Sequence, residues 1–325
     1  MEPVLEVKDA RVYYFTQQGP VKAVGGVSFG LQAGERLGLI GESGSGKSTL
    51  ALAIMRLIKP PGRIESGEIR LDGTDLLALS EEQIRKLRLA GIALISQGAM
   101  NSLNPVIRIR PQILDGLQSH GMQISKHESE ARVNELLKWV GLRPEVANMY
   151  PHELSGGMKQ RVCIAIAISL HPKVIIADEP TSALDVVVQR QVVETLGQVQ
   201  EDLGASVILI GHDMGIMAQF VDRVGIMYAG RLLEMGPVGD IFSNPQHPYS
   251  RLLIASLPSL EKKGVFQGIS GSPPSLLDLP PGCVFHPRCP YAMERCTVRH
   301  PELIPVGLNH WAACYLLEER CGAAS

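Results

Sequence analysis

A run of small residues with a single lysine, Gly-Glu-Ser-Gly-Ser-Gly-Lys-Ser-Thr at positions 41–49, has the spacing of a phosphate-binding loop. Glycines allow such a loop to turn its backbone N–H groups toward an anion, at the positive end of the helix that follows. Lys47 is then expected to bridge the β- and γ-phosphates of a nucleotide, and the Ser48 hydroxyl to ligate Mg²⁺. The nucleotide-binding residues predicted here are Gly41, Ser43, Gly44, Ser45, Gly46, Lys47, Ser48 and Thr49.

An acidic pair supplies the second half of this chemistry. Asp178 and Glu179 end the apolar run at 173–179, which reads as a buried strand. At the carboxyl end of a strand Asp178 can hold the water shell of Mg²⁺, and Glu179 can polarise an attacking water. The two motifs together predict a protein that binds a nucleoside triphosphate.

Cysteines form a third group of reactive residues. Cys283, Cys289, Cys296 and Cys314 are dense near the end of a chain with only 6 cysteines. The N-terminal sequence has no secretory signal, so a reducing compartment is expected and disulfides are the least favoured reading. Four thiolates suit zinc or an iron–sulfur cluster, with His286 and His310 as alternative ligands or neighbours, and the spacing alone does not choose.

Composition limits the function classes. The 325 residues carry a formal net charge of −2, which argues against a nucleic-acid binder that neutralises many phosphates. The apolar fraction of 45% and charged fraction of 20% are those of an ordinary globular protein. No apolar run approaches the roughly 20 residues of a bilayer span, so a cytosolic protein is expected.

The elements that position these groups follow from hydrophobic periodicity. Residues 36–41 and 206–213 read as further buried strands, and residues 188–203 form an amphipathic helix between strands, so a parallel sheet with crossover helices is predicted. The helix after the phosphate loop places Leu50, Ile54, Leu57 and Ile58 on one face. The segment 98–157 is helical in pattern, and the proline-rich sequence after 245 predicts a loop-rich appendage.

Leu-Ser-Gly-Gly-Met-Lys-Gln-Arg at 154–161, with Gln97, Ser-Ala-Leu-Asp at 182–185 and His212 in Gly-His-Asp, makes the assignment more specific. In these motifs, and over nearly its whole length, the chain resembles the ATPase subunits of ABC transporters. The resemblance implies an α/β P-loop NTPase cassette, with a RecA-like core that has a mixed sheet and with a helical subdomain. We expect the core at 1–97 and 158–245, the helical signature subdomain at 98–157 and the cysteine-containing appendage at 246–325.

The same resemblance implies the roles of further residues. It implies that Glu179, His212 and Gln97 are catalytic and that Gln97 also ligates Mg²⁺. It implies that Ser155, Gly156 and Gly157 face the ATP bound to a partner cassette. Asp185 is expected to contact that partner. Tyr14, with Tyr13 as the competitor, is expected to stack on adenine. Around Gln97, Ser96, Gly98 and Ala99 depart from the family's pattern, which puts the stiffness of this hinge in doubt.

The C-terminal region resembles that of dipeptide/oligopeptide-type importer ATPases, in Asn-Pro-Gln-His-Pro-Tyr (244–249) and in the segment 280–296. This implies a peripheral subunit on the cytoplasmic face of the inner or plasma membrane. It would work with two membrane permease subunits, a second ATPase subunit (heterodimer favoured over homodimer) and, indirectly, an extracytoplasmic solute-binding protein, without nucleic acid. The cofactors implied are ATP, Mg²⁺ and a [4Fe–4S] cluster on the four cysteines, with Zn²⁺ as the alternative.

Other functions are weighed against this one. A soluble ABC ATPase of translation or DNA repair usually has two cassettes or a long coiled-coil insertion, and neither is found. A non-catalytic regulatory cassette is disfavoured by the intact Glu179 and His212, and an exporter ATPase by the appendage. Importers for nickel, glutathione or oligosaccharide share the same C-terminal region and stay open.

Overall fold

The computed structural model describes residues 2–122, 125–256 and 268–322. Its N-terminal part forms a four-stranded antiparallel sheet with the order β2-β1-β4-β5. The strands are β1 (Leu5–Thr16), β2 (Gly19–Leu31), β4 (Gly62–Leu71) and β5 (Thr74–Asp75).

A second sheet of eight strands forms the centre of the molecule, in the order β11-β12-β10-β9-β3-β8-β7-β6. Its parallel strands are β3 (Arg36–Ile40), β6 (Ile92–Ile95), β7 (Val174–Asp178), β8 (Ser206–Ile210) and β9 (Arg223–Tyr228). Every residue of β7 and β8 is buried, as expected for parallel strands covered on both faces. Antiparallel strands extend one edge, so the predicted mixed sheet is confirmed.

Helices on this sheet connect its parallel strands. They are α1 (Lys47–Ile54), α5 (Gly156–Ala167), α6 (Val186–Leu203) and α7 (Met214–Phe220). In α6, Val192, Leu196 and Val199 are fully buried and form the predicted apolar stripe. Helix α1 is shorter than predicted: Arg56 has a φ of 50°, so the helix ends at Ile54, and Leu57 and Ile58 lie beyond it.

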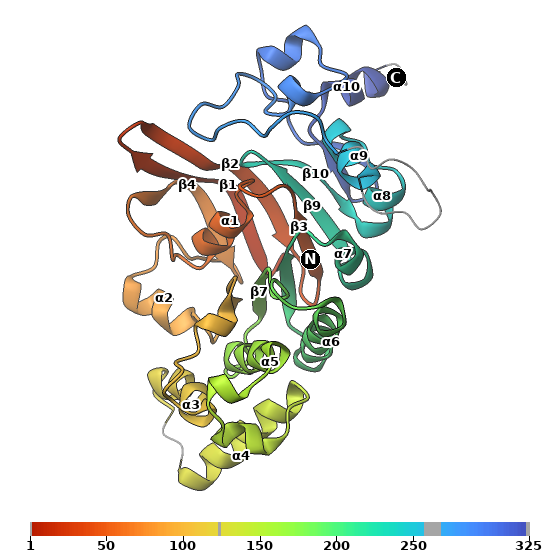
Figure 1. The fold of residues 1–325 in the computed structure, drawn as a ribbon. Helices are drawn as coiled ribbons and strands as arrows, with labels where there is room; N and C mark the ends of the chain where they lie inside the picture. Colours follow the sequence, from red (N-terminus) through yellow and green to blue (C-terminus); the bar gives the residue numbers. More distant parts are fainter. Residues whose placement is uncertain (1, 123–124, 257–267, 323–325) are drawn as a thin grey trace.

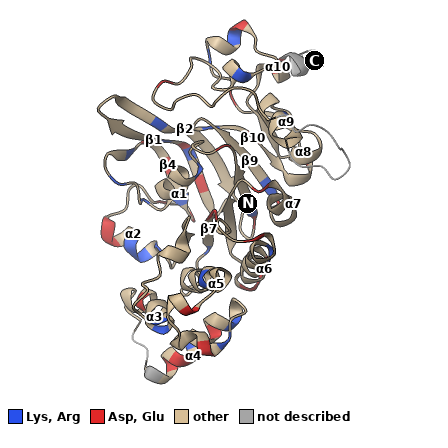
Figure 2. Ribbon diagram, in the orientation of Figure 1, with Lys and Arg blue, Asp and Glu red and all other residues tan. Residues whose placement is uncertain are grey.

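Between β6 and α5 the chain forms α3 (Ile109–Ser119), α4 (Lys126–Trp139) and the short helices η1 (Ala99–Asn101), η2 (Pro144–Asn148) and η3 (Pro151–Glu153). These elements lie at one end of the molecule, next to α2 (Glu81–Leu87) and α5 (Figure 1). Val133, Leu136, Leu137 and Val140 of the α4 region are fully buried, so the helical pattern predicted for this segment presents an apolar stripe to the core. Acidic and basic residues both lie along α2 and α4 (Figure 2), and in α2 the acidic ones, Glu81 and Glu82, precede the basic ones, Arg85 and Lys86.

The C-terminal region lies at the opposite end (Figure 1). It contains α8 (Val238–Ser243), α9 (Pro248–Ala255), η4 (His286–Arg288), η5 (Glu294–Thr297), β11 (Ile304–Gly307), β12 (His310–Ala312) and α10 (Tyr315–Gly322). Its elements are short, as the prolines predict, but β12 pairs with β10 (Arg231–Pro237) and so extends the central sheet. Among the described residues, the structure has no helix with the length and hydrophobicity of a membrane span.

Candidate nucleotide-binding site

The phosphate loop connects β3 to α1, and two of its glycines are required by their surroundings. Gly41 has a φ of 152°, and a Cβ there would lie 2.0 Å from the carbonyl oxygen of Met227. Gly46 has a φ of 99°, and its Cβ would lie 2.2 Å from the carbonyl oxygen of Ala23. Side chains at either position would displace backbone, so only glycine permits this loop.

Lys47 begins α1 with its side chain folded back over the loop. Its Nζ donates to the carbonyl oxygens of Gly41 (2.8 Å) and Glu42 (3.0 Å) and to the Ser45 hydroxyl (3.1 Å). Burial lowers the pKa of Lys47, while the nearby carboxylates of Glu179 and Asp178 oppose that shift. The ammonium is therefore held at the centre of the loop. A bound anion would replace some of the carbonyl oxygens as its hydrogen-bond acceptors.

Ser48 and Asp178 form the adjoining oxygen pair. The Ser48 hydroxyl donates to Asp178 Oδ1 at 3.0 Å, across the 130 residues that separate them in the chain. Burial raises the pKa of Asp178, and the hydrogen bond from Ser48 opposes this shift. A hydroxyl and a buried carboxylate beside a phosphate loop are the hard oxygen donors that Mg²⁺ prefers.

Glu179 follows β7 with an uncommon backbone conformation for a residue with a side chain, at a φ of 46°. Its carboxylate accepts a hydrogen bond from Gln97 Nε2 at 2.9 Å and lies 3.6 Å from His212 Nδ1. The structure therefore brings together the residues predicted to be catalytic, from the ends of β6, β7 and β8. A cavity of about 160 Å³ adjoins Glu179 and His212 and reaches Met217 of α7.

The residues after Gln97 are anchored, although the sequence put this hinge in doubt. Gly98 adopts a φ of 69° and opens η1. The carbonyl oxygen of Ala99 accepts hydrogen bonds from the Ser102 hydroxyl (2.6 Å) and from Cys163 Sγ of α5 (3.2 Å). Helix α5 therefore holds the segment next to Gln97 directly.

Ser155 and Asp185 begin two neighbouring helices. Ser155 accepts a hydrogen bond from the backbone N–H of Met158 at 3.3 Å and caps α5, and Asp185 caps α6. The motif at 155–157 thus lies at the positive end of a helix other than α1. Gly157 also has a packing role that the sequence did not reveal, because a Cβ there would lie 2.5 Å from Cγ1 of Val188 in α6.

Tyr13 and Tyr14 are both half-buried on β1. Tyr14 pairs with Gly62 of β4, and a Cβ at Gly62 would lie 2.6 Å from its ring. Tyr13 interacts with Arg11 instead. Neither contact decides which ring stacks on adenine, so Tyr14 stays the prediction.

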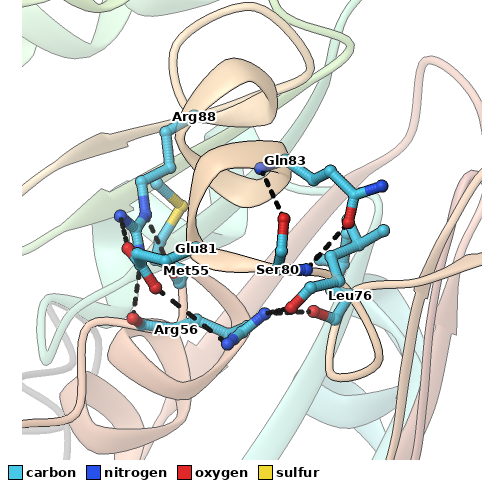
Figure 3. A network of polar contacts seen from close by, with 8 residues as sticks. Met55, Arg56, Leu76, Ser80, Glu81, Gln83 and Arg88 are labelled. Atoms are coloured by element: carbon cyan, nitrogen blue, oxygen red, sulfur yellow. Dashed lines mark hydrogen bonds and ion pairs between the residues drawn. The ribbon is translucent and has the colours of Figure 1, made fainter.

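The C-terminal end of α1 is fixed by an arginine network that sequence reasoning missed (Figure 3). Helix α2 begins with a capping box between Ser80 and Gln83. Arg88, which follows α2, donates from Nε to the carbonyl oxygen of Met55 (3.0 Å) and from Nη2 to that of Arg56 (2.8 Å). A guanidinium on the carbonyls directly after α1 complements the negative end of that helix.

Four predicted metal ligands, Cys283, Cys289, Cys296 and Cys314, line one cavity in the C-terminal region, together with His286. All four are free thiols. Burial raises the pKa of Cys283 and of Cys314 to about 11, and it also raises that of Cys289. The backbone joins two of them, because the N–H of Cys283 donates to the carbonyl oxygen of Cys296 at 2.8 Å.

The side chains do not converge on one ion. Within the described ranges, no three or more His, Cys, Asp or Glu side chains are grouped as a metal ion would need. His310 is engaged elsewhere, with its Nε2 2.7 Å from Glu234 Oε1. The predicted ligands are therefore neighbours around a cavity, and the arrangement itself does not establish a metal site.

Comparison with known proteins places this geometry in a family. Residues 24–182 match the ABC transporter family, and residues 233–296 match the C-terminal region of the oligopeptide/dipeptide transporter family. The chain is 44% identical over 319 residues to the oligopeptide transport ATP-binding protein OppD of Bacillus subtilis, which covers 97% of this chain and 89% of that protein. It is 45% identical to OppD of Salmonella typhimurium, over 96% and 93% of the two chains.

Solved structures give the same result for the cassette. The dimeric ATP-binding cassette MJ0796, in a post-hydrolysis state bound to ADP and Pi, aligns with a TM-score of 0.64 and 28% identity, over 72% of this chain and 98% of that one. CbiO1 from Clostridium perfringens, part of the ABC transporter complex cbiONQ, aligns with a TM-score of 0.63 and 27% identity, over 75% and 92%. The chain therefore belongs to the ABC transporter ATPases and, within them, to the ATP-binding proteins of oligopeptide and dipeptide transport.

Proposed function

We propose that this chain is the ATPase subunit of a peptide importer, coupling ATP binding and hydrolysis to uptake of dipeptides or oligopeptides through separate permease subunits. The match of residues 233–296 to the oligopeptide/dipeptide transporter C-terminal region carries the proposal. The names of the relatives support peptides as the cargo. The chain would act as a peripheral subunit on the cytoplasmic face of the membrane.

The nucleotide site would work by positioning and charge. The loop N–H groups and Lys47 would hold the phosphates of ATP, and Ser48 and Gln97 would ligate Mg²⁺, with Asp178 on its water shell. The hydrogen bond between Ser48 and Asp178 supports this assignment, because it brings the two oxygen donors together beside the loop. Tyr14 would stack on the adenine.

Hydrolysis would use the groups around Glu179. Its carboxylate would accept a proton from the attacking water, while His212 and Gln97 would orient that water and the γ-phosphate. The contacts of Glu179 with both side chains support these roles.

A second cassette would complete each site. Ser155, Gly156 and Gly157 would face the γ-phosphate of ATP on the partner, and Asp185 would contact that partner. Their position at a helix N-terminus, apart from the phosphate loop, supports a role in trans. We favour a related, non-identical ATPase as partner, and we divide the chain into a core (1–97 and 158–245), a signature subdomain (98–157) and an appendage (246–325).

The cargo can be tested with the complete transporter. The chain is co-expressed with its permeases and partner ATPase, and the complex is placed in lipid nanodiscs. ATP hydrolysis should rise several-fold on adding peptide-loaded binding protein, compared with the unloaded protein. Stimulation by nickel, glutathione or an oligosaccharide, but not by peptide, would assign the chain to one of the alternative importers.

We further propose that Cys283, Cys289, Cys296 and Cys314 hold a [4Fe–4S] cluster, which would staple an appendage that has little core of its own. All four are unpaired thiols lining one cavity, a soft donor set that suits iron–sulfur or zinc. In a [4Fe–4S] cluster each cysteine would bind a different iron. Four thiols that surround one cavity without meeting at a single point fit this arrangement. The raised pKa values of Cys283, Cys289 and Cys314 mean that a bound metal would have to displace protons from these thiols.

Metal analysis tests this second proposal. Anaerobic purification should give a brown protein with broad visible absorption and about four irons per chain. Cys289→Ser should lower the iron content, whereas Cys163→Ser, in α5, should leave it unchanged. A colourless anaerobic preparation with one zinc per chain would exclude the cluster.

A further inference from the structure

One side chain of the C-terminal region reaches the phosphate loop. Nη1 of Arg288, at the end of η4, lies 3.0 Å from both Oε1 and Oε2 of Glu42, the second residue of the loop. The side chain of Arg288 is only 7% exposed and that of Glu42 24% exposed. The ion pair is therefore largely shielded from water, and it links residues that are 246 positions apart.

Other contacts fix the direction of the Arg288 guanidinium. Nε donates to the carbonyl oxygen of Ser270 (2.9 Å), Nη2 to that of Ile269 (3.0 Å), and Nη1 also to the Tyr228 hydroxyl (3.1 Å). A planar guanidinium with all three nitrogens engaged cannot turn without breaking several bonds. The C-terminal region therefore determines where the charge presented to Glu42 lies.

Glu42 is in turn held on its backbone. Its N–H donates to the hydroxyl of Tyr249 in α9 at 3.1 Å, and its carbonyl oxygen accepts from Lys47 Nζ at 3.0 Å. The rings of Tyr228, Tyr249 and Phe285 pack together, with centroids 4.7–5.3 Å apart. One residue of the loop thus connects these packed rings, which come from β9 and from the C-terminal region, to the lysine expected to bind phosphate.

Charge gives the pair a second effect. The Glu42 carboxylate acts electrostatically on the Lys47 ammonium. An unpaired carboxylate at this place would compete with a nucleotide phosphate for that ammonium and would repel the phosphate itself. Arg288 therefore both orients the loop and neutralises a charge that opposes an anionic ligand.

From these contacts we propose that Arg288 is a positioning residue for the phosphate loop: by holding and neutralising Glu42 it keeps the loop in its nucleotide-binding conformation, so that the docked C-terminal region sets the affinity for ATP. The inference rests on the proposed role of the loop as the ATP site. It does not depend on what the four cysteines bind, since Arg288 contacts Glu42 with free thiols in place.

The test compares ATP binding by the full-length chain and its variants. Arg288→Ala should raise the dissociation constant of a fluorescent ATP analogue by about tenfold, as expected when the binding-competent loop is populated only about a tenth of the time. In the assembled transporter KM should rise more than kcat falls, and Arg288→Lys should be intermediate. Arg299→Ala is the matched control, because Arg299 is exposed in the same region and forms an ion pair with the exposed Glu302.

Two further measurements separate positioning from a general structural effect. Removing the charge of Glu42 removes its repulsion of phosphate, so Arg288→Ala should weaken binding less in a Glu42→Gln background than in the wild type. Hydrogen exchange of residues 41–47 should accelerate in Arg288→Ala, while exchange in β7 and β8 stays unchanged. If the effects of Arg288→Ala and Glu42→Gln on the free energy of ATP binding are fully additive, and hydrogen exchange of residues 41–47 is unchanged, the inference is overturned.

Lys47→Ala distinguishes failure of this inference from failure of the proposed site. If Lys47→Ala loses ATP binding while Arg288→Ala binds like the wild type, the site stands and the role of Arg288 is wrong. If Lys47→Ala retains full affinity, the assignment of the loop itself is wrong. Should Arg288→Ala not fold, Arg288→Lys decides, and an unchanged affinity in that variant overturns the inference.

Discussion

Glu179 combines an unusual backbone conformation with contacts from two other strand ends. A positive φ in a residue with a Cβ costs about 1–3 kcal/mol and is kept where the surroundings determine it. Here the N–H of Glu179 donates to the carbonyl oxygen of Ile210, and its own carbonyl oxygen accepts from the Ser182 hydroxyl. These hydrogen bonds hold the strained backbone, and in this conformation the Glu179 carboxylate points toward Gln97 and His212.

At this scale we predict that Glu179→Gln lowers the turnover of ATP in the assembled transporter at least about 100-fold, the effect of losing a general base. The amide has nearly the same size and can still contact Gln97, so ATP affinity should be retained. Turnover is measured by phosphate release, and affinity with a fluorescent ATP analogue.

Glu194→Gln is the control for this prediction. Glu194 is an exposed acid on α6 that pairs with Arg190, and its loss should leave turnover near that of the wild type. Near-normal hydrolysis by the Glu179→Gln complex would remove Glu179 from the mechanism.

Single residues were predictable where type and spacing define a chemistry. The places of Lys47, Asp178 and Glu179 in the fold could be predicted because their motifs specify both the loop and the strand end on which they lie. Glu42 and Arg288 could not, since nothing local to either residue indicates a partner 246 positions away. The choice between Tyr13 and Tyr14 depends on strand register, and β1 has register shifts next to Tyr13.

Helices α5 and α6 are in close contact at a glycine of the signature motif. A Cβ on Gly157 would lie 2.5 Å from Cγ1 of Val188, and valine has little freedom to rotate away in a helix. The glycines of the signature motif therefore serve packing as well as any contact with nucleotide. A sequence motif alone does not separate these two reasons for glycine.

We accordingly predict that Gly157→Ala destabilises the isolated chain by about 1–3 kcal/mol, the usual cost of overpacking. Gly239→Ala, where no atom lies within 4 Å of the added Cβ, is the control and should not destabilise. Adding Val188→Ala to Gly157→Ala should restore part of the loss. Urea unfolding measures all four chains, and a fully stable Gly157→Ala would show that the helices can separate at no cost.

Elements were predictable where the periodicity is strong, as in α4 and α6. The end of α1 was not, because it depends on a positive φ at Arg56 and on carbonyl contacts from Arg88 (Figure 3). Strands β11 and β12 were also missed. They have only four and three residues, and they form by pairing with β10 and each other rather than from local pattern.

At the scale of the whole molecule, a buried carboxylate links the core to the C-terminal region. Glu234 of β10 is fully buried and accepts hydrogen bonds from the N–H groups of Gln246 (2.7 Å) and His247 (2.8 Å), and it lies beside His310. Burial alone would raise the pKa of Glu234, but these hydrogen bonds outweigh it and hold the pKa below its ordinary value. The charged form of Glu234 therefore stabilises the docked state.

Glu234→Gln should destabilise the protein by about 3 kcal/mol at neutral pH, because one partner of a buried charged network is removed. A group with a lowered folded pKa contributes stability above its unfolded pKa and loses it as pH falls through the folded value. The difference between variant and wild type should therefore shrink below the ordinary carboxyl pKa of 4.5. Urea midpoints at several pH values measure it, and a difference independent of pH would contradict the role of the charge.

The central claim is that ATP hydrolysis at this site drives peptide uptake, and transport itself tests it most directly. The complete transporter is reconstituted in proteoliposomes that contain ATP, and a labelled peptide is supplied outside with its binding protein. We predict peptide accumulation with the wild-type chain and with Glu194→Gln, and none with Glu179→Gln or without ATP. Accumulation by the Glu179→Gln transporter at the wild-type rate, or no peptide uptake by a wild-type complex that hydrolyses ATP, would contradict the account.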